Sequence, residues 1–192
     1  MSTQKGEGKS YRLATEKDLE FYRLAEEYLE EKRKKLWEEW GIDPVPDEPT
    51  PEGRGRGAER AFSVRNYGLD TWGDLFNSRQ KLALITFTEK VRLAYKNMTE
   101  EGYDKDYAKA VVSYLGLVIS RMADFESNLC RWQPQWEFIP NTFARQALPM
   151  TWDYAELNLF SPILTGTWDS MFGQIIDALS NLTQIPPVES ED

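Results

Sequence analysis

The stretch RQALPMTWDYAE, residues 145–156, combines cationic, amide, acidic and aromatic side chains around a single proline. Arg145 and Gln146 have N–H donors that can bind the edges of bases or phosphate oxygens. Trp152 has a flat ring on which a base can stack. The stretch is therefore a candidate contact surface for a nucleic acid or for another protein.

A packed interior is the alternative interpretation of the same residues. In that interpretation the aromatic rings fill space between helices, and Asp153 or Glu156 neutralises Arg145. We expect a division of roles, in which the two acids orient Arg145 while Arg145 and Gln146 reach a partner. Three side chains are expected to anchor the segment to the helices: Met150, Trp152 and Tyr154.

Arginine, glutamine and tryptophan recur at two further places in the chain. Arg79 and Gln80 begin a predicted helix, although Arg79 has an alternative role as the ion-pair partner of Asp74. Arg131 and Trp132 follow the only cysteine. In chain order, the candidate contacts to DNA or to a protein partner are Arg79, Gln80, Arg131, Trp132, Arg145, Gln146 and Trp152.

The chain has no histidine and a single cysteine, Cys130, and this excludes several kinds of site. Nucleophilic arrangements that use histidine as the base cannot form. Histidine and cysteine cannot supply the four ligands of a structural zinc site. Because no base accompanies Cys130, we expect it to be a small buried apolar residue. The sequence predicts no catalytic, cofactor-binding or metal-binding residue.

The composition limits the ways in which the protein can bind a partner and the compartments in which we expect it. A formal net charge of −9 argues against binding nucleic acid by bulk electrostatics, although it allows a local basic patch. One cysteine indicates a reducing compartment. No apolar run approaches the roughly 20 residues of a membrane span, and residues 1–10 do not resemble a signal peptide. We expect a cytoplasmic protein with no membrane partner.

The predicted elements are helices, and the fold class is mainly α: an irregular helical domain with a long N-terminal helix. Thr15 is the expected N-cap of that helix, Asp18 its capping-box partner and Gly41 its stop. The expected organisation is a flexible N-terminus at 1–14, a long charged helix at 15–42, a Pro/Gly/Arg linker at 43–60, a helical core domain at 61–184 and a disordered tail at 185–192.

The helical core is expected to contain a buried central helix. Two helices are predicted at 78–101 and 104–129, and residues 110–120 of the second carry no charge. A helix that is apolar on nearly every side is typically surrounded by others. Further along this helix, Arg121 and Asp124 are expected to neutralise each other.

A long irregular segment separates the central helix from the last one. It covers about thirty residues after Cys130, and its high aromatic content predicts an ordered segment rather than a disordered one. Ordered segments of this length without regular structure are usually functional or wrap another surface. The last helix is expected at about 167–182.

Three motifs carry a resemblance to a known family: YGLDTWGDLFNSRQKLAL, SRMADFESNLCRW and NTFARQALPMTWDYAELNLFSP. Together they resemble the central region of a family of adenine-specific DNA methylases. That family carries a zinc ribbon and is often found beside anti-phage defence genes. The resemblance runs from about Tyr11 to Trp168. Family members usually read Asn-Pro-Phe where this chain has Asn158, Leu159 and Phe160.

The resemblance implies a methylase context without the catalytic parts. In the family, the S-adenosylmethionine-binding glycine motif and the zinc ribbon lie on the N-terminal side of this region. The Asp-Pro-Pro-Tyr catalytic motif lies on its C-terminal side. S-adenosylmethionine and zinc are therefore expected only in the rest of the family architecture. The implied partners are the remaining methylase halves, in cis or in trans, and duplex DNA.

Two functions follow as hypotheses. The first is a non-catalytic helical subunit or fragment of an S-adenosylmethionine-dependent DNA adenine methyltransferase, acting as a scaffold or as a DNA-contact (target-recognition) region. The second is a stand-alone protein–protein interaction module that kept the fold and lost the methylase context. The second predicts an exposed apolar face on the first helix. An enzyme in its own right is the least favoured hypothesis, because no loop here is suited to cradle the cofactor.

Overall fold

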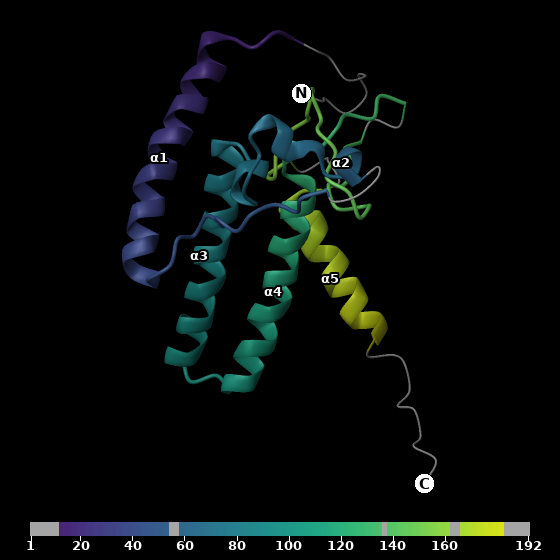
Figure 1. Ribbon diagram of the computed structural model, residues 1–192. Helices are drawn as coiled ribbons and strands as arrows, with labels where there is room; N and C mark the ends of the chain where they lie inside the picture. The colour runs from purple at the N-terminus through teal and green to yellow at the C-terminus, as the bar shows by residue number, and fades with distance from the viewer. Residues whose placement is uncertain (1–11, 54–57, 136–137, 162–165, 183–192) are drawn as a thin grey trace.

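The computed structural model describes residues 12–53, 58–135, 138–161 and 166–182, and its long helices lie side by side in chain order (Figure 1). The long helices are α1 (Glu16–Trp40), α3 (Ser78–Glu100), α4 (Lys105–Phe125) and α5 (Trp168–Leu182). Between α1 and α3 lie the short helix α2 (Ala58–Ala61) and two 3₁₀ turns, η1 (Ser63–Tyr67) and η2 (Gly73–Leu75). The mainly α class is confirmed.

The packing partners of the helices define an open layer. α1 packs against α3, α3 against α4, and α4 against α5. α3 and α4 form an antiparallel hairpin in the middle of this layer (Figure 1). None of the described helices is long and apolar enough to cross a membrane. The expected disordered tail, most of the expected flexible N-terminus and residues 54–57 of the expected linker lie outside the described residues.

α1 begins and ends where its local signals predict. At the N-terminus, the backbone N–H and the hydroxyl of Thr15 each donate to Asp18 at 2.7 Å. At the C-terminus, Gly41 adopts φ 72°, a left-handed conformation that closes the helix. Only Leu29 and Leu36 are fully buried against the rest of the protein. α1 therefore lies across α3 through a narrow apolar stripe.

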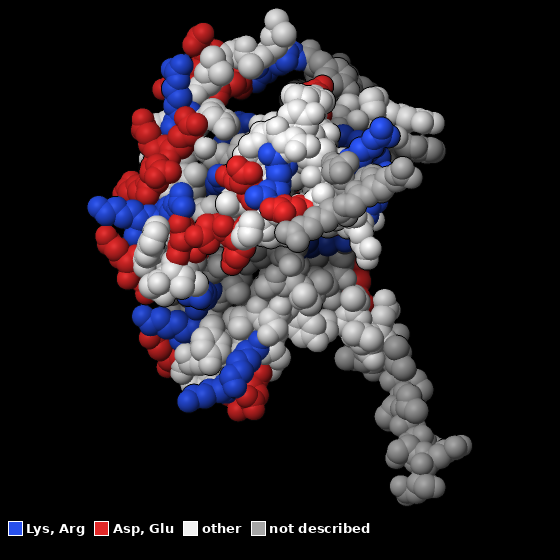
Figure 2. All heavy atoms as spheres, in the orientation of Figure 1, with Lys and Arg blue, Asp and Glu red and all other residues white. Residues whose placement is uncertain are grey.

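Charged side chains gather over α1, as Figure 2 shows. An ion pair between Lys32 and Glu89 joins α1 to α3. The guanidinium of Arg92 lies over the ring of Trp40, 4.3 Å from its centroid. These contacts supplement the apolar stripe, and they leave most of the charge of α1 in water.

The segment 43–53, which follows α1, is extended but packed. Its prolines favour the extended backbone expected of a linker, whereas Val45 and Thr50 are buried and not solvated. The N–H of Gly73 donates to the carbonyl of Pro46 at 2.9 Å, and the N–H of Thr50 donates to the carbonyl of Asp70 at 2.8 Å. The segment therefore forms part of the core domain, because its carbonyls and amides pair with residues 70–73.

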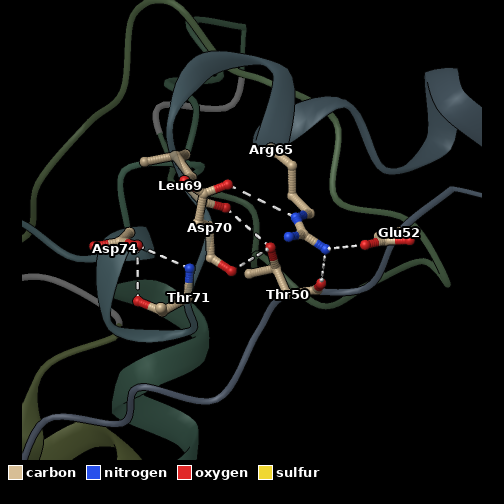
Figure 3. Close-up of polar contacts among 7 residues, drawn as sticks. All are labelled: Thr50, Glu52, Arg65, Leu69, Asp70, Thr71 and Asp74. Carbon is tan, nitrogen blue, oxygen red and sulfur yellow. Dashed lines mark hydrogen bonds and ion pairs between the residues drawn. The ribbon is translucent and has the colours of Figure 1, made fainter.

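Side chains reinforce this pairing, and Figure 3 shows the cluster. The hydroxyl of Thr50 donates to the carbonyl of Leu69 at 2.9 Å. Arg65 donates to the carboxylate of Glu52 at 2.9 Å and to the carbonyl of Thr50 at 3.4 Å. On the other side of the pairing, Thr71 donates to Asp74 through its N–H and its hydroxyl.

α3 begins with a reciprocal cap. The side chain of Asn77 accepts from the N–H of Gln80 at 3.0 Å, and the side chain of Gln80 accepts from the N–H of Asn77 at 2.9 Å. Asp104 caps α4 by accepting from two backbone amides. α4 ends at Phe125 rather than at 129, because the N–H of Asn128 pairs with the carbonyl of Leu75 at 2.7 Å and draws the chain out of the helix.

α4 is central in the layer, between α3 and α5, but part of its surface is exposed. Val118 and Met122 are fully buried and pack with residues of α5 and of the preceding loop. On the part of α4 that stays uncovered, Tyr114 is 39% exposed and Leu117 is 53% exposed. The expectation of a helix surrounded on nearly every side therefore fails for that face. The reason is that a layer of helices supplies α4 with neighbours on two flanks rather than on all sides.

An aromatic stack joins α5 to the hairpin. The rings of Phe87 and Trp168 lie 4.5 Å apart between centroids, with an angle of 18° between their planes. Phe160 stacks on the same Phe87 ring at 6.0 Å. Met171 of α5 and Leu159 complete the buried part of this contact. The stack therefore fixes residues 159–160 of the irregular segment against α3 and α5.

Candidate functional site

The irregular segment that follows α4 folds back on itself and on the start of α3. Isolated antiparallel bridges pair Arg131 with Tyr154 and Gln133 with Phe138. The N–H of Ala155 donates to the carbonyl of Cys130 at 2.6 Å. The described part of the segment is ordered, as its aromatic content predicted, and these pairings bring residues 129–131 beside residues 151–155.

Asp124, near the end of α4, anchors the middle of the segment. Its carboxylate accepts from the N–H of Phe143 at 2.8 Å and from the amide of Asn141 at 3.1 Å. Its carbonyl accepts from the N–H of Thr142 at 2.7 Å. The predicted pairing of Arg121 with Asp124 is wrong, because the carboxylate turns toward these loop donors. The guanidinium of Arg121 lies instead over the ring of Phe125 at 5.1 Å.

A buried polar cluster at the end of α4 also contacts the turn at residues 141–143. The hydroxyls of Ser127 and Thr142 are 2.7 Å apart, and the Sγ of Cys130 lies 3.2 Å from the hydroxyl of Thr142. Cys130 is fully buried, as predicted. These contacts hold residues 141–143 rigidly against the end of α4.

The anchored turn and the neighbouring strand-like residues enclose a hollow of about 190 Å³ that contains two arginines, Arg131 and Arg145. The remaining lining residues are Leu129, Pro140, Asn141, Thr142, Ala144, Ala147, Pro149 and Thr151. We call it the two-arginine hollow. Arg131 and Arg145 are exposed, and neither forms an ion pair with a residue in the described ranges.

Neither Asp153 nor Glu156, the two acids expected beside Arg145, forms an ion pair with it in the described part of the chain. Glu156 accepts from the guanidinium of Arg79 at 2.8 Å and from the amide of Asn77 at 3.0 Å. The pairing of Arg131 with Tyr154 directs Glu156 toward the start of α3, away from Arg145. The expected orientation of Arg145 by Glu156 is therefore wrong, and the guanidinium stays available in the two-arginine hollow.

Arg79 and Gln80 have roles inside the protein. Arg79 pairs with Glu156 rather than with Asp74, because Thr71 donates to Asp74 through two groups. Gln80 is 1% exposed and belongs to the cap of α3. Gln80 therefore does not face a partner, and its position at the start of a helix indicated a cap rather than a contact.

The aromatic candidates differ in exposure. Trp152 is 76% exposed, and its ring meets the ring of Tyr67 edge-on at 4.8 Å. The expected anchoring by burial is therefore wrong for Trp152. It follows Thr151 in the chain, and Thr151 lines the two-arginine hollow. Trp132 is half-buried, and Gln146 is exposed next to Arg145.

The two other expected anchors hold the segment through polar contacts. The N–H of Met150 donates to the hydroxyl of Ser63 at 2.9 Å. The hydroxyl of Tyr154 accepts from the amide of Asn77 at 3.3 Å. Met150 is half-buried, and Tyr154 remains 40% exposed.

Glu126 is a buried carboxyl that sequence reasoning missed. Burial and the nearby negative charge of Glu156 raise the pKa of Glu126 to about 8, although the N–H of Leu157 and the charge of Arg79 oppose the shift. Its Oε1 has no hydrogen-bond partner among the described residues. Nothing local marks this glutamate, because its burial comes from the return of residues 154–157 over the end of α4.

Among the described residues, no cluster of three or more histidine, cysteine, aspartate or glutamate side chains is arranged to hold a metal ion. The two-arginine hollow is suited to bind an anionic group, because Arg131 and Arg145 both line it and none of its other lining residues is acidic. No protein-family model, no curated protein and no solved structure matches this chain.

Proposed function

We propose that this chain is a non-catalytic helical region of an S-adenosylmethionine-dependent DNA adenine methyltransferase, and that it contacts DNA at the two-arginine hollow. The observation that carries the proposal is the pair of exposed guanidinium groups of Arg131 and Arg145, which lack ion-pair partners among the described residues. The three motifs that resemble the methylase family supply the DNA as the partner. The cofactor and the catalytic motif belong to the remaining halves of the enzyme.

The physical support is local rather than global. A net charge of −9 repels DNA at long range, so binding must depend on a small site with fixed geometry. Asp124 provides that geometry, because it holds residues 141–143 from the rigid end of α4. A guanidinium on a fixed support loses less rotational freedom when it binds a phosphate oxygen than one on a free loop. Trp152, the residue after Thr151 of the hollow, supplies an exposed ring for stacking.

The proposal is tested by fluorescence anisotropy with labelled duplex DNA at low salt. The wild-type chain is expected to bind, and Arg131→Ala or Arg145→Ala is expected to raise the Kd roughly five- to tenfold, because each removes a charge-assisted hydrogen bond. Arg23→Ala is the matched control, since Arg23 is an exposed arginine on α1, far along the chain from the hollow.

The controls decide between site binding and general attraction. An equal loss of affinity in Arg23→Ala and in Arg131→Ala contradicts a contact at the two-arginine hollow. The absence of any binding by the wild-type chain, together with failure to associate with a polypeptide that carries the cofactor and catalytic motifs, contradicts the methylase assignment.

A second candidate function is a protein–protein interaction module. The observation that favours it is an exposed apolar face on the first helix, formed by Phe21, Leu24 and Tyr28, which are 53%, 38% and 60% exposed. These residues recur at spacings of three and four, so they share one side of α1. This candidate predicts a stable homodimer or heteromer, which light scattering detects. Phe21→Glu is expected to dissociate it, and a monodisperse monomer contradicts the candidate.

A further inference from the structure

A cavity of about 290 Å³ lies between the α3–α4 hairpin and the segment that follows α1, and neither proposed function uses it. The residues that line it from α3 are spaced by three and four positions, so they share one face of that helix. They are Lys81, Leu84, Ile85 and Thr88. We call it the Lys81 cavity, because Lys81 is the charged residue among the described residues that line it.

The wall that α4 contributes explains why the two helices leave space here. Its residues repeat the same spacings, and three of the four are small: Gly116, Ile119, Ser120 and Ala123. A Cβ added at Gly116 would meet no atom within 4 Å. Because Gly116 shares the face of the other lining residues of α4, a larger side chain at this position would extend into the Lys81 cavity.

The segment after α1 closes the cavity with apolar surface. Val45 lines it between two prolines, which have no N–H, and Gly73 and Phe76 lie beside them. The N–H of Val45 donates to Asp43 at 3.0 Å. The N–H of Gly73 donates to the carbonyl of Pro46 at 2.9 Å, and that of Phe76 donates to the carbonyl of Gly73 at 3.2 Å. This wall therefore offers a ligand apolar contact and no backbone donor.

The polar group that the cavity offers most strongly is the ammonium of Lys81. The hydroxyl of Thr88 is already used, because it donates to the carbonyl of Leu84 at 2.8 Å. Lys81 is half-buried and forms no ion pair with a residue in the described ranges. The charge of Asp74 acts on Lys81, but Asp74 accepts two hydrogen bonds from Thr71 and does not line the cavity. A cation at the wall of an apolar cavity is best satisfied by an anion.

We propose that the Lys81 cavity binds a medium-chain aliphatic carboxylate, with its chain between α3 and α4 and its carboxylate at the ammonium of Lys81. A water molecule occupies about 30 Å³ in the liquid, so the cavity holds on the order of ten groups of that size. A carboxylate of about eight carbons matches this volume. One ammonium neutralises one carboxylate, whereas a phosphate ester with two negative charges would keep one charge unpaired beside apolar walls.

The test is isothermal titration calorimetry of the whole chain with octanoate. Saturable binding of one octanoate per chain is expected. The Kd should rise roughly fourfold for each methylene removed, from octanoate to hexanoate to butanoate, because each methylene loses apolar burial. Octanol, which has the same chain without the charge, should bind at least about tenfold more weakly.

Lys81→Met tests the contact to the carboxylate. Methionine keeps an apolar stem and removes the charge, so the Kd for octanoate should rise at least about tenfold while the Kd for octanol stays within about twofold. Lys90→Met is the matched control, since Lys90 is an exposed lysine on α3 that does not line the cavity. An equal effect of the two variants on octanoate binding overturns the proposal.

Gly116→Leu tests the location of the chain. Leucine is a good helix former, and its side chain occupies part of the space that the ligand needs, so the Kd for octanoate should rise at least about tenfold. Gly173→Leu is the matched control, because a Cβ added at Gly173 of α5 also meets no atom within 4 Å and Gly173 does not line the cavity. Circular dichroism of both variants confirms that the helices are retained. Binding by Gly116→Leu as tight as that of the wild type overturns the site.

Two further outcomes overturn the proposal. One is the absence of saturable binding by the wild type at concentrations below those at which octanoate forms micelles. The other is tighter binding of a tripeptide with a C-terminal leucine than of octanoate, which assigns the cavity to the end of a polypeptide rather than to a free acid. The inference depends on neither proposed function.

Discussion

At the scale of single residues, Glu126 couples the stability of the protein to pH. Burial, assisted by the charge of Glu156, raises its pKa to about 8 from an ordinary value of 4.5. The folded state therefore binds a proton that the unfolded state releases between these two values. The stabilising effect is complete below about pH 4.5 and is lost as the pH rises through about 8. Asp43 and Glu89 act in the acidic range instead, because hydrogen bonds from Arg33 and Lys32 lower their pKa.

Glu126→Gln is expected to remove this pH dependence. Glutamine resembles the protonated carboxyl in shape and cannot ionise, so the variant avoids the cost of a buried charge at high pH. We expect the free energy of unfolding of the wild type to fall by roughly 2–4 kcal/mol between about pH 6 and pH 9, and that of the variant to change much less. Urea unfolding at both pH values measures the difference. Glu20→Gln, on the exposed surface of α1, is the control; a variant as pH-dependent as the wild type contradicts the assignment.

Asp124 is the residue on which the shape of the two-arginine hollow depends. Asp124→Ala leaves the N–H of Phe143 and the amide of Asn141 without their acceptor. We expect a loss of about 1–3 kcal/mol in the free energy of unfolding, measured with urea. Asp177→Ala, on the exposed side of α5, should change stability by less than about 0.5 kcal/mol. Weakened DNA binding by Asp124→Ala, despite the loss of a negative charge, is the expected sign of a positioning role.

At the scale of elements, Gly73 shows how closely the segment after α1 packs on the core. A Cβ at this position would lie 2.7 Å from the carbonyl oxygen of Pro46 and 2.7 Å from the side chain of Val45. Gly73→Ala must therefore displace the backbone of the segment, at a cost of about 1–3 kcal/mol. Gly116→Ala is the control, because no atom lies within 4 Å of its added Cβ. It should stabilise α4 by about 0.5–1 kcal/mol. Chemical denaturation should therefore show a lower free energy of unfolding for Gly73→Ala and a higher one for Gly116→Ala than for the wild type.

The ends of the helices were predictable where the signal is local. Thr15 with Asp18 and the left-handed Gly41 bound α1 at the expected positions. The end of α4 was not predictable, because it depends on the pairing of Asn128 with the distant Leu75. The same limit applies to the segment after α1, whose prolines indicate its extended backbone but not its pairing with residues 70–73.

The candidate site was predictable in its residue types and not in its pairings. Arg131 and Arg145 were recognised as cations in an aromatic segment, but nothing in their spacing places them around one hollow. Ion pairs were predicted between neighbours in the sequence. In the structure, Arg79 pairs with Glu156, 77 positions away, because the fold brings the irregular segment back to the start of α3.

At the scale of the whole molecule, charge is concentrated on the α1 side, where Figure 2 shows acidic and basic atoms interleaved. The net charge of −9 gives the chain little long-range attraction for DNA, so we expect the proposed DNA contact to be confined to a few cations. Confinement has a quantitative consequence, since each phosphate contact contributes about −0.9 to the slope of log K against log salt concentration. Two arginines predict a slope of about −2, whereas a broad basic surface gives −6 or steeper.

The salt slope is therefore the measurement that relates the two-arginine hollow to the overall charge. Anisotropy titrations at several salt concentrations should give a slope of about −2 for the wild type and about −1 for Arg131→Ala. Arg23→Ala should keep the wild-type slope, because its guanidinium is not part of the hollow. A wild-type slope steeper than about −4 requires cations outside the hollow. In that case the DNA contact extends to other basic residues. The net negative charge then does not confine the contact to the two-arginine hollow.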